Sequence, residues 1–368
     1  MRAVGVTPKS RQVGLLSHPA PRITQPGQVK VRTIEVGICG TDREICNFDY
    51  GTPPDGSDYL VLGHEALGEV VEVGPGVTTL GMGDLVVPTV RRPCPHHTCP
   101  SCQSDRQDFC FTGDFTERGI KMTHGFMTEY FVEEEKHLNI VPKDLADVAV
   151  LVEPLTVAEK ALAQIWSVQS RLPWTNGASQ GGAGHGKTAV VLGAGPVGIL
   201  GAMALIVNGF KTYVYSRSAK PNPKAALVES IGATYTSCET VPVKKFAEQV
   251  GNIDVVYEAV GSARIAFDVL DILGLNGIFV FTGIPGHKAA IPIDADLLMR
   301  QMVLKNQVAV GTVNADRPAF ENAIRDLGTF KKRWPKAVQS IITGRFPLDA
   351  YRDLLLGKAT GIKNVITL

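Results

Sequence analysis

The first 150 residues consist of short runs in which apolar and polar positions alternate, separated by glycine and proline. Three such runs are "QVKVRTIEVGI" (28–38), "GEVVEVGPGV" (68–77) and "GDLVVPTV" (83–90). Alternation with a period of two is typical of strands that bury one face, and glycine and proline mark the turns between them. The pattern therefore predicts a β-rich first domain.

The pattern changes at Thr188, where apolar strands begin to alternate with helix-like stretches. The clearest later strands are "KTYVYS" (211–216), "IDVVYEAVG" (253–261) and "GIFVFTGIPG" (277–286). Strands that alternate with helices are typical of a parallel, doubly wound α/β sheet. Between the two regions, residues 151–166 have the apolar spacing of a helix, and the Gly-, Ser- and Gln-rich stretch 167–186 is expected to form an exposed loop.

These changes predict an α/β protein in three parts. Residues 1–160 form the β-rich domain, and residues 161–312 form a Rossmann dinucleotide-binding domain. Residues 313–368 form a C-terminal segment that ends in the apolar strand "NVITL". Such a strand can pair with the first domain, so we expect the segment to return to it.

Charge and composition limit the classes of partner. The chain has 368 residues, with 37 Lys plus Arg against 36 Asp plus Glu, so a net charge of +1 provides no basic field for nucleic acid or an anionic membrane. Residues 188–210 are uncharged over a length that could span a bilayer, but the glycines and proline at 193–198 favour a buried strand, turn and helix. The first residues lack the apolar core of a signal peptide, so we expect a cytoplasmic protein that binds small molecules.

The stretch "VVLGAGPVGIL" contains the pattern GxGxxG between an apolar strand and an apolar helix. In that context the glycines allow a tight turn and close approach of a pyrophosphate, whose charge meets the helix N-terminus. A glycine turn with a purely structural role is the alternative. The residues expected to bind a dinucleotide here are Gly193, Gly195, Pro196, Val197 and Gly198.

The end of the next strand selects between NAD and NADP, because an acid there pairs with the ribose hydroxyls and repels the extra phosphate. In this chain the position reads Ser216, Arg217 and Ser218, with no acid before Glu229. A cation and two hydroxyls predict that NADP is used at least as well as NAD. The alternative is that Arg217 is an ordinary solvated surface charge.

Four of the seven cysteines lie in "CPHHTCPSCQSDRQDFC", which also contains His96 and His97. In a protein expected to be cytosolic, such a cluster is typical of a closed tetrahedral zinc site rather than of disulfides. A loop of reduced thiols without metal is the alternative. The zinc lobe, about residues 94–110, contains Cys94, Cys99, Cys102 and Cys110.

Three residues elsewhere have side chains that can bind a second metal: Cys39 in "GICGTD", His64 in "LGHEALGEV" and Glu153 in "LVEPLTV". A catalytic zinc uses about three protein ligands and keeps an open position, and thiolate, imidazole and carboxylate all qualify. Taken singly, the three are equally explained as a core thiol, a hydrogen-bonded histidine and a helix N-terminal acid. Whether the three residues act together as one metal site depends on the resemblance of the chain to a known family.

The motifs "GICGTD", "GHEALGEV" and "GAGPVG", with the four-cysteine lobe and the alternation of strands and helices, together resemble the zinc-dependent medium-chain alcohol dehydrogenases. Within that superfamily, "LVEPLTVAEKAL", "FTERGI", "HGFMTEYF" and "VGTVNADRPAF" are similar to glucose 1-dehydrogenases of the archaeal type. The resemblance covers nearly the whole chain. It implies a GroES-like catalytic domain followed by a Rossmann domain, in a homodimer or homotetramer.

The resemblance implies a catalytic zinc held by Cys39, His64 and Glu153. Glu65 would adjoin the metal, and Thr41 would orient the reacting hydroxyl and relay its proton. A carboxylate in place of the third-ligand cysteine of ordinary alcohol dehydrogenases keeps the formal charge of the site at zero.

The resemblance also implies the contacts of substrate and coenzyme. Glu117 and Asn314 match positions that hydrogen-bond glucose hydroxyls, beside Thr41, Glu65 and Glu153. The nicotinamide end of the coenzyme would lie along "FTGIPG". The coenzyme contacts expected there are Thr282, Gly283 and, again, Asn314.

Three departures from the family pattern matter. His96, not Cys94, matches the usual first ligand of the structural zinc, which leaves either residue as the ligand. Val90 and Val157 stand where relatives have Asn or Asp, so fewer sugar contacts are expected. The haloarchaeal members are strongly acidic, and this chain is not.

The expected function is a zinc-dependent oxidation of D-glucose, galactose or xylose at C1 to the aldonolactone, with NADP or NAD as the acceptor and two zinc ions per subunit. A polyol, threonine or other secondary-alcohol dehydrogenase is the alternative on the same scaffold. A non-catalytic NADPH-binding protein or a zinc-free quinone reductase is the alternative of another class. The set of Cys39, His64 and Glu153 argues against both of the latter.

Overall fold

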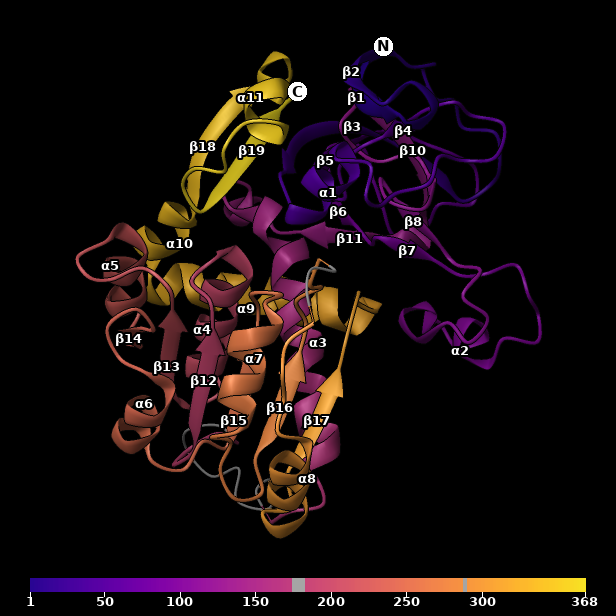
Figure 1. The fold of residues 1–368 in the computed structure, drawn as a ribbon. Helices are drawn as coiled ribbons and strands as arrows, with labels where there is room; N and C mark the ends of the chain where they lie inside the picture. The colour runs from indigo at the N-terminus through magenta and orange to yellow at the C-terminus, as the bar shows by residue number, and fades with distance from the viewer. Residues whose placement is uncertain (174–182, 287–289) are drawn as a thin grey trace. The chain divides into compact units, whose positions relative to one another are not determined.

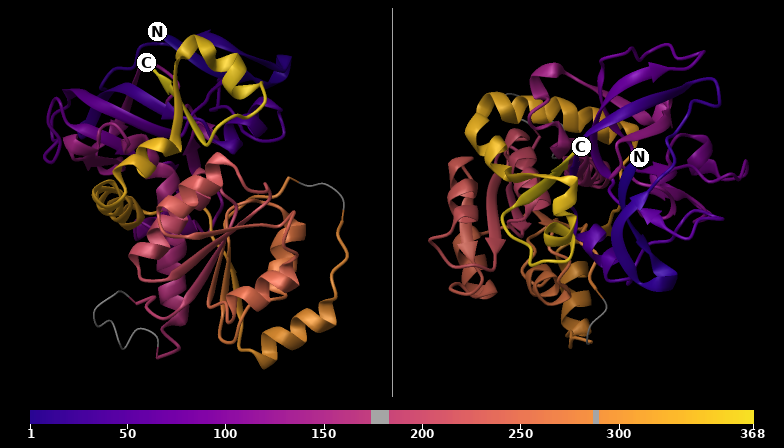
Figure 2. Two further views of the ribbon diagram at one scale, coloured as in Figure 1. Left: turned by 90° about the vertical axis from the view of Figure 1, so that its left-hand side faces the viewer. Right: turned by 90° about the horizontal axis from the view of Figure 1, so that it is seen from above.

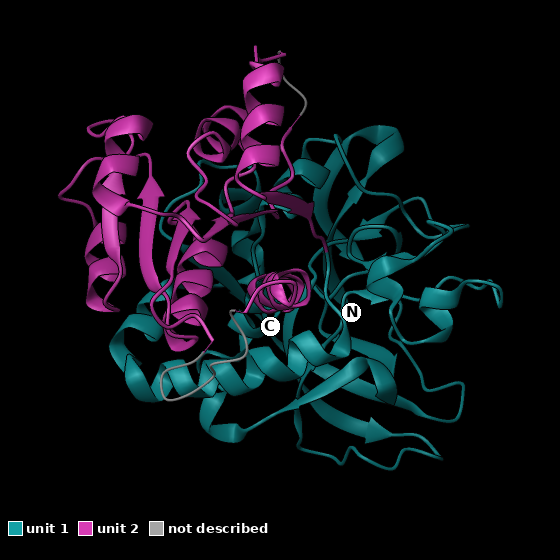
Figure 3. Cartoon of the chain, turned by 90° about the horizontal axis from the view of Figure 1, so that it is seen from below, with its two compact units in different colours: residues 1–156, 314–368 teal, residues 157–313 magenta. Residues whose placement is uncertain are grey.

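A computed structural model of the chain describes residues 1–173, 183–286 and 290–368 and shows two compact units. Unit 1 comprises residues 1–156 and 314–368, and unit 2 comprises residues 157–313 (Figure 3). The first boundary between the units lies four residues before the expected one at 160/161. The second boundary lies one residue after the expected one at 312/313. The expected domain boundaries stay a prediction.

Unit 1 is built mainly of antiparallel strands, as the alternating pattern predicts. Its largest sheet has the order β11-β6-β5-β3-β19-β18, with β10 also paired to β3 (Figure 1). These strands are β3 (Gln28–Gly37), β5 (Glu65–Val73), β6 (Leu85–Pro88), β10 (Tyr130–Glu134), β11 (Leu138–Val141), β18 (Ile342–Pro347) and β19 (Lys363–Thr367). Two small sheets join β1 (Arg2–Thr7), β2 (Gln12–Ser17) and β4 (Leu60–Val61), and β7 (Arg91–Arg92), β8 (Thr116–Arg118) and β9 (Met122–Thr123).

The core of unit 1 follows from this alternation. Val29 and Val31 of β3 are fully buried, whereas Lys30 and Arg32 between them are partly exposed. The buried positions join one apolar cluster with residues of β5, β6, β10 and β19. The helices of this unit are α1 (Gly40–Cys46), α2 (Pro100–Gln103), α9 (Arg317–Arg333), α10 (Pro335–Ile341) and α11 (Tyr351–Leu355).

The last strand of the chain lies inside the largest sheet. β19 pairs antiparallel with β3, with Val365 opposite Gly37 and Ile366 opposite Val36. The final residues therefore lie beside the end of β3, which leads directly into the loop that carries Cys39.

Unit 2 contains a six-stranded parallel sheet of the order β14-β13-β12-β15-β16-β17 (Figure 1). Its strands are β12 (Thr188–Leu192), β13 (Lys211–Ser216), β14 (Thr234–Ser237), β15 (Val255–Glu258), β16 (Ile278–Phe281) and β17 (Val308–Gly311). In chain order this is 3-2-1-4-5-6, the order of a dinucleotide-binding Rossmann sheet. The order reverses between β12 and β15, and ligands of such sheets bind at the carboxyl ends of the strands at that point. The predicted doubly wound sheet is confirmed.

Helices cover both faces of this sheet (Figure 2). The helices of this unit are the greater part of α3 (Val152–Gln169), α4 (Pro196–Val207), α5 (Pro223–Ser230), α6 (Val243–Val250), α7 (Ala263–Leu270) and α8 (Ala295–Leu304). Val190 and Leu192 of β12 belong to the apolar cluster formed with α6 and α7. Val191 faces the other way, since a Cβ added to Gly198 of α4 would lie 3.6 Å from its Cγ1. Burial on both faces explains why these strands are apolar throughout.

Two expectations for the middle of the chain have different outcomes. α3 (Val152–Gln169) continues three residues into the stretch expected to be a loop from residue 167, and residues 174–182 of that stretch lie outside the described residues. Residues 188–210 form β12, a turn, α4 and the residues that connect α4 to β13, as expected. No helix in the described part of the chain is both long and apolar enough to cross a bilayer.

Candidate active site and metal centres

The structure brings Cys39, His64 and Glu65 together in unit 1. The sulfur of Cys39, a ring nitrogen of His64 and a carboxylate oxygen of Glu65 lie within 4.8 Å of one another. Sheet pairing explains their proximity, because Gly37 at the end of β3 lies opposite Glu65 at the start of β5. A Cβ on Gly37 would lie too close to Glu65 Oε2, so a larger residue there would displace the Glu65 carboxylate.

Asp42 orients the residues of this cluster, a role that its place in "GICGTD" does not predict. It is fully buried, and its carboxylate accepts hydrogen bonds from the backbone N–H of Cys39 at 2.8 Å and of Gly63 at 3.3 Å. The same carboxylate faces His64 Nδ1 at 3.5 Å. Burial alone would lower the pKa of His64, but Asp42 and Cys39 raise it well above its usual value.

Lys363 of β19 is the cation of the site. It is 2% exposed, and its Nζ donates to both oxygens of Glu65, at 2.8 and 2.5 Å, and to the carbonyl of Ile38 at 3.1 Å. The two charged residues are 298 positions apart in the chain. Spacing along the sequence therefore contains no signal for this pair, which arises from the pairing of β19 with β3.

Glu153 lies in the first turn of α3, outside the group of three but within electrostatic reach of it. Its pKa is raised to about 7, first by burial and then by the charge of Glu65, against the lowering effect of His64. Thr41, two residues after Cys39, is half-buried, and its hydroxyl makes no hydrogen bond within the described residues. Thiolate, imidazole and carboxylate are ligands that zinc accepts, so the donor set fits the expected metal.

Glu117 and Asn314 lie in contact, as their common expected role requires. Asn314 Nδ2 donates to Glu117 Oε1 at 3.1 Å across 197 positions of sequence. Arg91 donates to the same oxygen through Nε at 3.0 Å and through a terminal nitrogen at 2.9 Å. Glu117 Oε1 thus receives three donors, and Oε2 receives none from the described residues.

Tyr50 links this group with the metal cluster. Burial raises the pKa of its phenol, and the charge of Glu117 raises it further, whereas Arg91 and His64 lower it. One side chain therefore lies within electrostatic reach of both Glu117 and His64. Neither Tyr50 nor Arg91 was identified from the sequence, because each is unremarkable without its neighbours.

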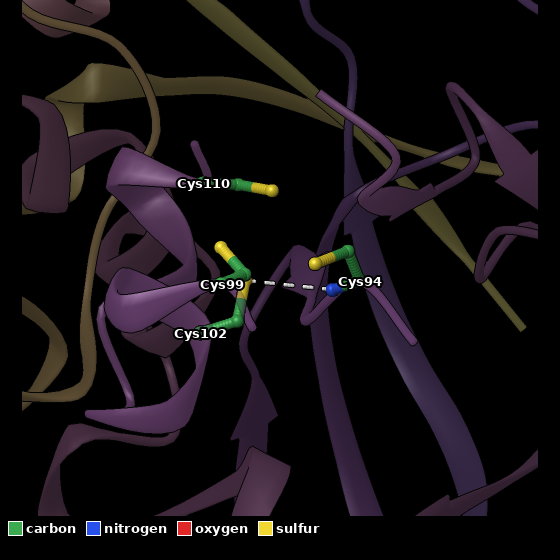
Figure 4. Close-up of side chains that lie close together, drawn as sticks. All are labelled: Cys94, Cys99, Cys102 and Cys110. Atoms are coloured by element: carbon green, nitrogen blue, oxygen red, sulfur yellow. Dashed lines mark hydrogen bonds between the residues drawn. The ribbon is translucent and has the colours of Figure 1, made fainter. Parts of the chain in front are cut away.

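The sulfurs of the cysteine lobe converge on a common space (Figure 4). Those of Cys94, Cys99, Cys102 and Cys110 lie within 4.8 Å of one another. Backbone N–H groups of Cys102 and Phe111 lower the pKa of Cys99, and hydrogen bonding from Thr112 lowers that of Cys110 to about 6 against the effect of burial. Burial raises the pKa of Cys102 to about 12, so the surroundings favour the thiolate at Cys99 and Cys110 only. The convergence of four sulfurs fits a closed zinc site.

His96 does not join that group. Its Nε2 pairs with Asp114 at 2.5 Å, and its side chain is 44% exposed. The geometry therefore favours Cys94 over His96 as the fourth ligand, a choice that the spacing in the sequence left open.

The three glycines of the GxGxxG turn have three different environments in unit 2. Gly193 has a φ of +99°, which side-chain residues rarely adopt. A Cβ on Gly195 would meet nothing within 4 Å, so the backbone there is open to a ligand. A Cβ on Gly198 would clash with the carbonyl of Gly193, so the first turn of helix α4 packs closely against the glycine turn. Pro196 and Val197 begin that helix, whose N-terminal N–H groups attract phosphate.

The three residues expected to select the coenzyme lie at the end of β13. Ser216 is the last residue of the strand, and Arg217 and Ser218 follow it in exposed positions. The guanidinium of Arg217 has no hydrogen-bond or ion-pair partner in the described part of the chain, whereas Lys220 pairs with Glu229. Thr282 and Gly283 follow β16, two strands from the glycine turn.

Comparison with known families identifies both halves of the chain. The alcohol dehydrogenase GroES-like domain matches residues 25–143, and the glucose dehydrogenase C-terminus matches residues 146–368. The glucose 1-dehydrogenase of Methanocella arvoryzae is 35% identical over 367 residues, and that of Thermoproteus tenax is 38% identical over 370 residues. Each comparison covers 100% of this chain and 99% of the relative.

Solved structures give the same result. The glucose dehydrogenase of Haloferax mediterranei in complex with NADP, Zn and gluconolactone superimposes with a TM-score of 0.88 and 33% identity, covering 100% of this chain and 99% of the other. Galactitol-1-phosphate dehydrogenase from Escherichia coli superimposes with a TM-score of 0.79 at 22% identity and covers 100% of both chains, which shows a shared fold alone.

The choice between Cys94 and His96 can be tested by metal content. We expect Cys94→Ser to lose one zinc per subunit, because a neutral hydroxyl is a far weaker ligand than a thiolate. His96→Ala, the matched control in the same loop, should keep the zinc content of the unmodified protein. Elemental analysis of both purified variants decides the point, and loss of zinc from His96→Ala alone would contradict the geometry.

Proposed function

The chain belongs to the glucose dehydrogenases, which carry the GroES-like domain of the alcohol dehydrogenases, and on that basis we propose that it oxidises D-glucose at C1 to the lactone with NADP as preferred acceptor. The observation that carries the proposal is the pairing, within unit 1, of a zinc-type donor set with a polar group suited to sugar hydroxyls. Tyr50 lies within electrostatic reach of both groups. A polyhydroxylated substrate offers the donors and acceptors that Glu117 and Asn314 can use.

Zinc bound by Cys39, His64 and Glu153 would supply a Lewis acid for the hydroxyl oxygen at C1. Asp42 faces Nδ1 of His64, which leaves Nε2 as the nitrogen available to a metal. The hydroxyl of Thr41, two residues from Cys39, would orient the sugar hydroxyl and relay its proton toward solvent, accepting that proton as it gives up its own. Lys363 holds both oxygens of Glu65, so that carboxylate stays ordered beside the ligands.

NADP would accept the hydride in this reaction. The chain contributes the open backbone at Gly195 and the N-terminus of α4 for the pyrophosphate. Arg217 and the hydroxyls of Ser216 and Ser218 suit the additional phosphate of NADP. Thr282, Gly283 and Asn314 are proposed contacts of the nicotinamide end.

Substrate assays separate this proposal from its alternatives. We expect NADP reduction with D-glucose, and weaker reduction with galactose or xylose, in a panel that also contains polyols, threonine and simple secondary alcohols. Preference for one of these latter substrates would instead favour the alternative dehydrogenase on the same scaffold. A protein that binds NADPH but oxidises nothing, or that reduces quinones without zinc, would belong to the second class of alternative.

Glu117→Gln tests the sugar contact. The amide oxygen of Gln can keep the three donors now on Oε1, but its NH₂ group replaces the acceptor Oε2. Loss of one hydrogen bond to a buried hydroxyl costs about 1 to 3 kcal/mol, so kcat/KM for glucose should fall roughly 5- to 150-fold, with zinc content and NADP affinity unchanged.

The matched control for this variant is Glu133→Gln. Glu133 is also buried and also pairs with arginines, namely Arg92 and Arg118, but it lies outside the proposed sugar site. The Glu133→Gln variant should have a lower melting temperature and an unchanged KM for glucose. Unaltered glucose kinetics in Glu117→Gln would show that the residue does not touch the sugar.

Arg217→Ala tests coenzyme choice. Charge-assisted hydrogen bonds contribute about 1.5 to 3 kcal/mol each, so the Kd for NADP should rise roughly 10- to 150-fold. NAD lacks the phosphate and should be affected far less. Lys245→Ala, which removes an exposed cation from α6 of the same unit, is the control and should change neither Kd. Equal losses for both coenzymes in Arg217→Ala would contradict the proposed phosphate contact.

We also propose that the partner of the chain is a second copy of itself, in a dimer or tetramer. β17 ends the described sheet of unit 2, so one of its sides is free to pair. Beside it in sequence, α8 exposes Met299, Val303 and Leu304 at 65%, 71% and 65%. Contiguous exposed apolar side chains on one helix are typical of a protein interface. Light scattering of the purified protein tests this against a monomer.

The proposed location is the cytoplasm. All seven cysteines are unpaired in the structure, and reduced cysteines that can hold zinc are typical of a reducing compartment.

A further inference from the structure

A buried carboxylate lies at the edge of the unit 2 sheet where the coenzyme is expected. Glu258 is the last residue of β15 and is 1% exposed. No lysine or arginine among the described residues pairs with it. A buried charge without a counter-ion is costly unless hydrogen bonds compensate it, so its partners indicate what it does.

Those partners are backbone N–H groups from two separate loops. Glu258 Oε1 accepts from Val260 at 2.8 Å and from Gly261 at 2.7 Å, in the loop after β15. Glu258 Oε2 accepts from Gly283 at 3.0 Å, in the loop after β16. The carbonyl of Glu258 also accepts from the Thr282 hydroxyl at 2.6 Å. One side chain thus joins the two loops.

The same loops pack tightly against each other and against the glycine turn. A Cβ on Gly283 would clash with the backbone nitrogen of Gly261. A Cβ on Gly193 would lie only 2.7 Å from Val260 Cγ2. β15 lies between β12 and β16 in the sheet, so these three segments meet at the carboxyl ends of adjacent strands, next to the switch point.

We propose that Glu258 is a positioning residue for the coenzyme, which fixes loop 259–261 and loop 282–283 relative to the glycine turn. The inference rests on the coenzyme use proposed above. A carboxylate fits this task because it offers acceptors on both oxygens, and because ionised acceptors make the stronger hydrogen bonds with N–H groups. Glutamine has a single acceptor oxygen, so its NH₂ group would face either the N–H of Gly283 or those of Val260 and Gly261.

Glu258→Gln is the direct test, with coenzyme affinity measured by fluorescence titration of NADPH and NADH. We expect the Kd of both coenzymes to rise roughly 10- to 100-fold, since one loop loses its anchor. The ratio of the two Kd values should stay unchanged, unlike that of Arg217→Ala. Saturating coenzyme should restore most of kcat, and the glucose KM measured under those conditions should be unaltered.

Asp254→Asn is the matched control. Asp254 immediately precedes β15, and its carboxylate accepts from the backbone N–H of Thr188 at 2.8 Å at the opposite, amino-terminal edge of the same sheet. This variant removes a comparable acceptor from the unit. It should lower the melting temperature and leave both coenzyme affinities unchanged.

Hydrogen exchange gives a readout at the proposed contact. In Glu258→Gln the amides of the freed loop should exchange faster, while those of β12 and β13 keep their protection. Should Glu258→Gln fail to fold, Glu258→Asp keeps the charge but is one methylene too short to reach both loops, and it should show the same loss of coenzyme affinity.

Two results would overturn the inference: unchanged Kd values in a folded Glu258 variant, or equal losses of affinity in Glu258→Gln and Asp254→Asn. Failure of the unmodified protein to bind either coenzyme would instead refute the proposed function, so the two failures are distinguishable.

Discussion

Compensation of buried negative charge is the constraint on which unit 1 depends. Cys39, Asp42, Glu65 and Glu153 bring acidic groups into one region, and buried charges without partners are costly. Lys363 compensates Glu65, and backbone N–H groups with His64 compensate Asp42. Cys39 and Glu153 have only the nearby charges of His64 and Lys363, and the zinc ion proposed above would add the missing compensation.

The fold supplies this compensation by bringing distant parts of the chain together. Lys363 comes from the last strand, and that strand reaches the site because it pairs with β3, which ends beside Cys39. Asn314 reaches Glu117 in the same way, from the segment that follows unit 2. Unit 2 must instead compensate negative charge from a ligand, because the proposed coenzyme carries phosphates. The N-terminus of α4 and the guanidinium of Arg217, which has no partner among the described residues, are the groups proposed to do so.

Much of the fold could be predicted from local pattern alone. Alternation of buried and exposed positions in β3, and strands apolar on both faces around Gly193, are set by neighbours one or two residues away. The convergence of Cys39, His64 and Glu65 could be expected only through a resemblance. Lys363 could not be expected at all, because no local rule relates it to a residue 298 positions earlier.

Features that depend on contacts between residues distant in the chain could not be predicted from the sequence either. Spacing could not rank Cys94 against His96 as a ligand of the structural zinc, and the geometry favours Cys94 because the His96 ring pairs with Asp114. The loop expected from residue 167 begins later, since α3 continues to Gln169, whose fully buried side chain donates to the carbonyl of Asn276. Glu258 stood in a correctly predicted strand, but its role follows from loops 259–261 and 282–283, which adjoin only in the folded sheet.

The central claim is that a metal cation completes the charge balance of unit 1 and enables glucose oxidation. The most direct measurement follows the melting temperature and NADP-linked glucose oxidation of one chelator-treated sample as Zn²⁺ is added back. Our account predicts that chelation abolishes oxidation and lowers the melting temperature, and that added Zn²⁺ restores both together. Full glucose oxidation in protein shown by elemental analysis to be free of metal would contradict it.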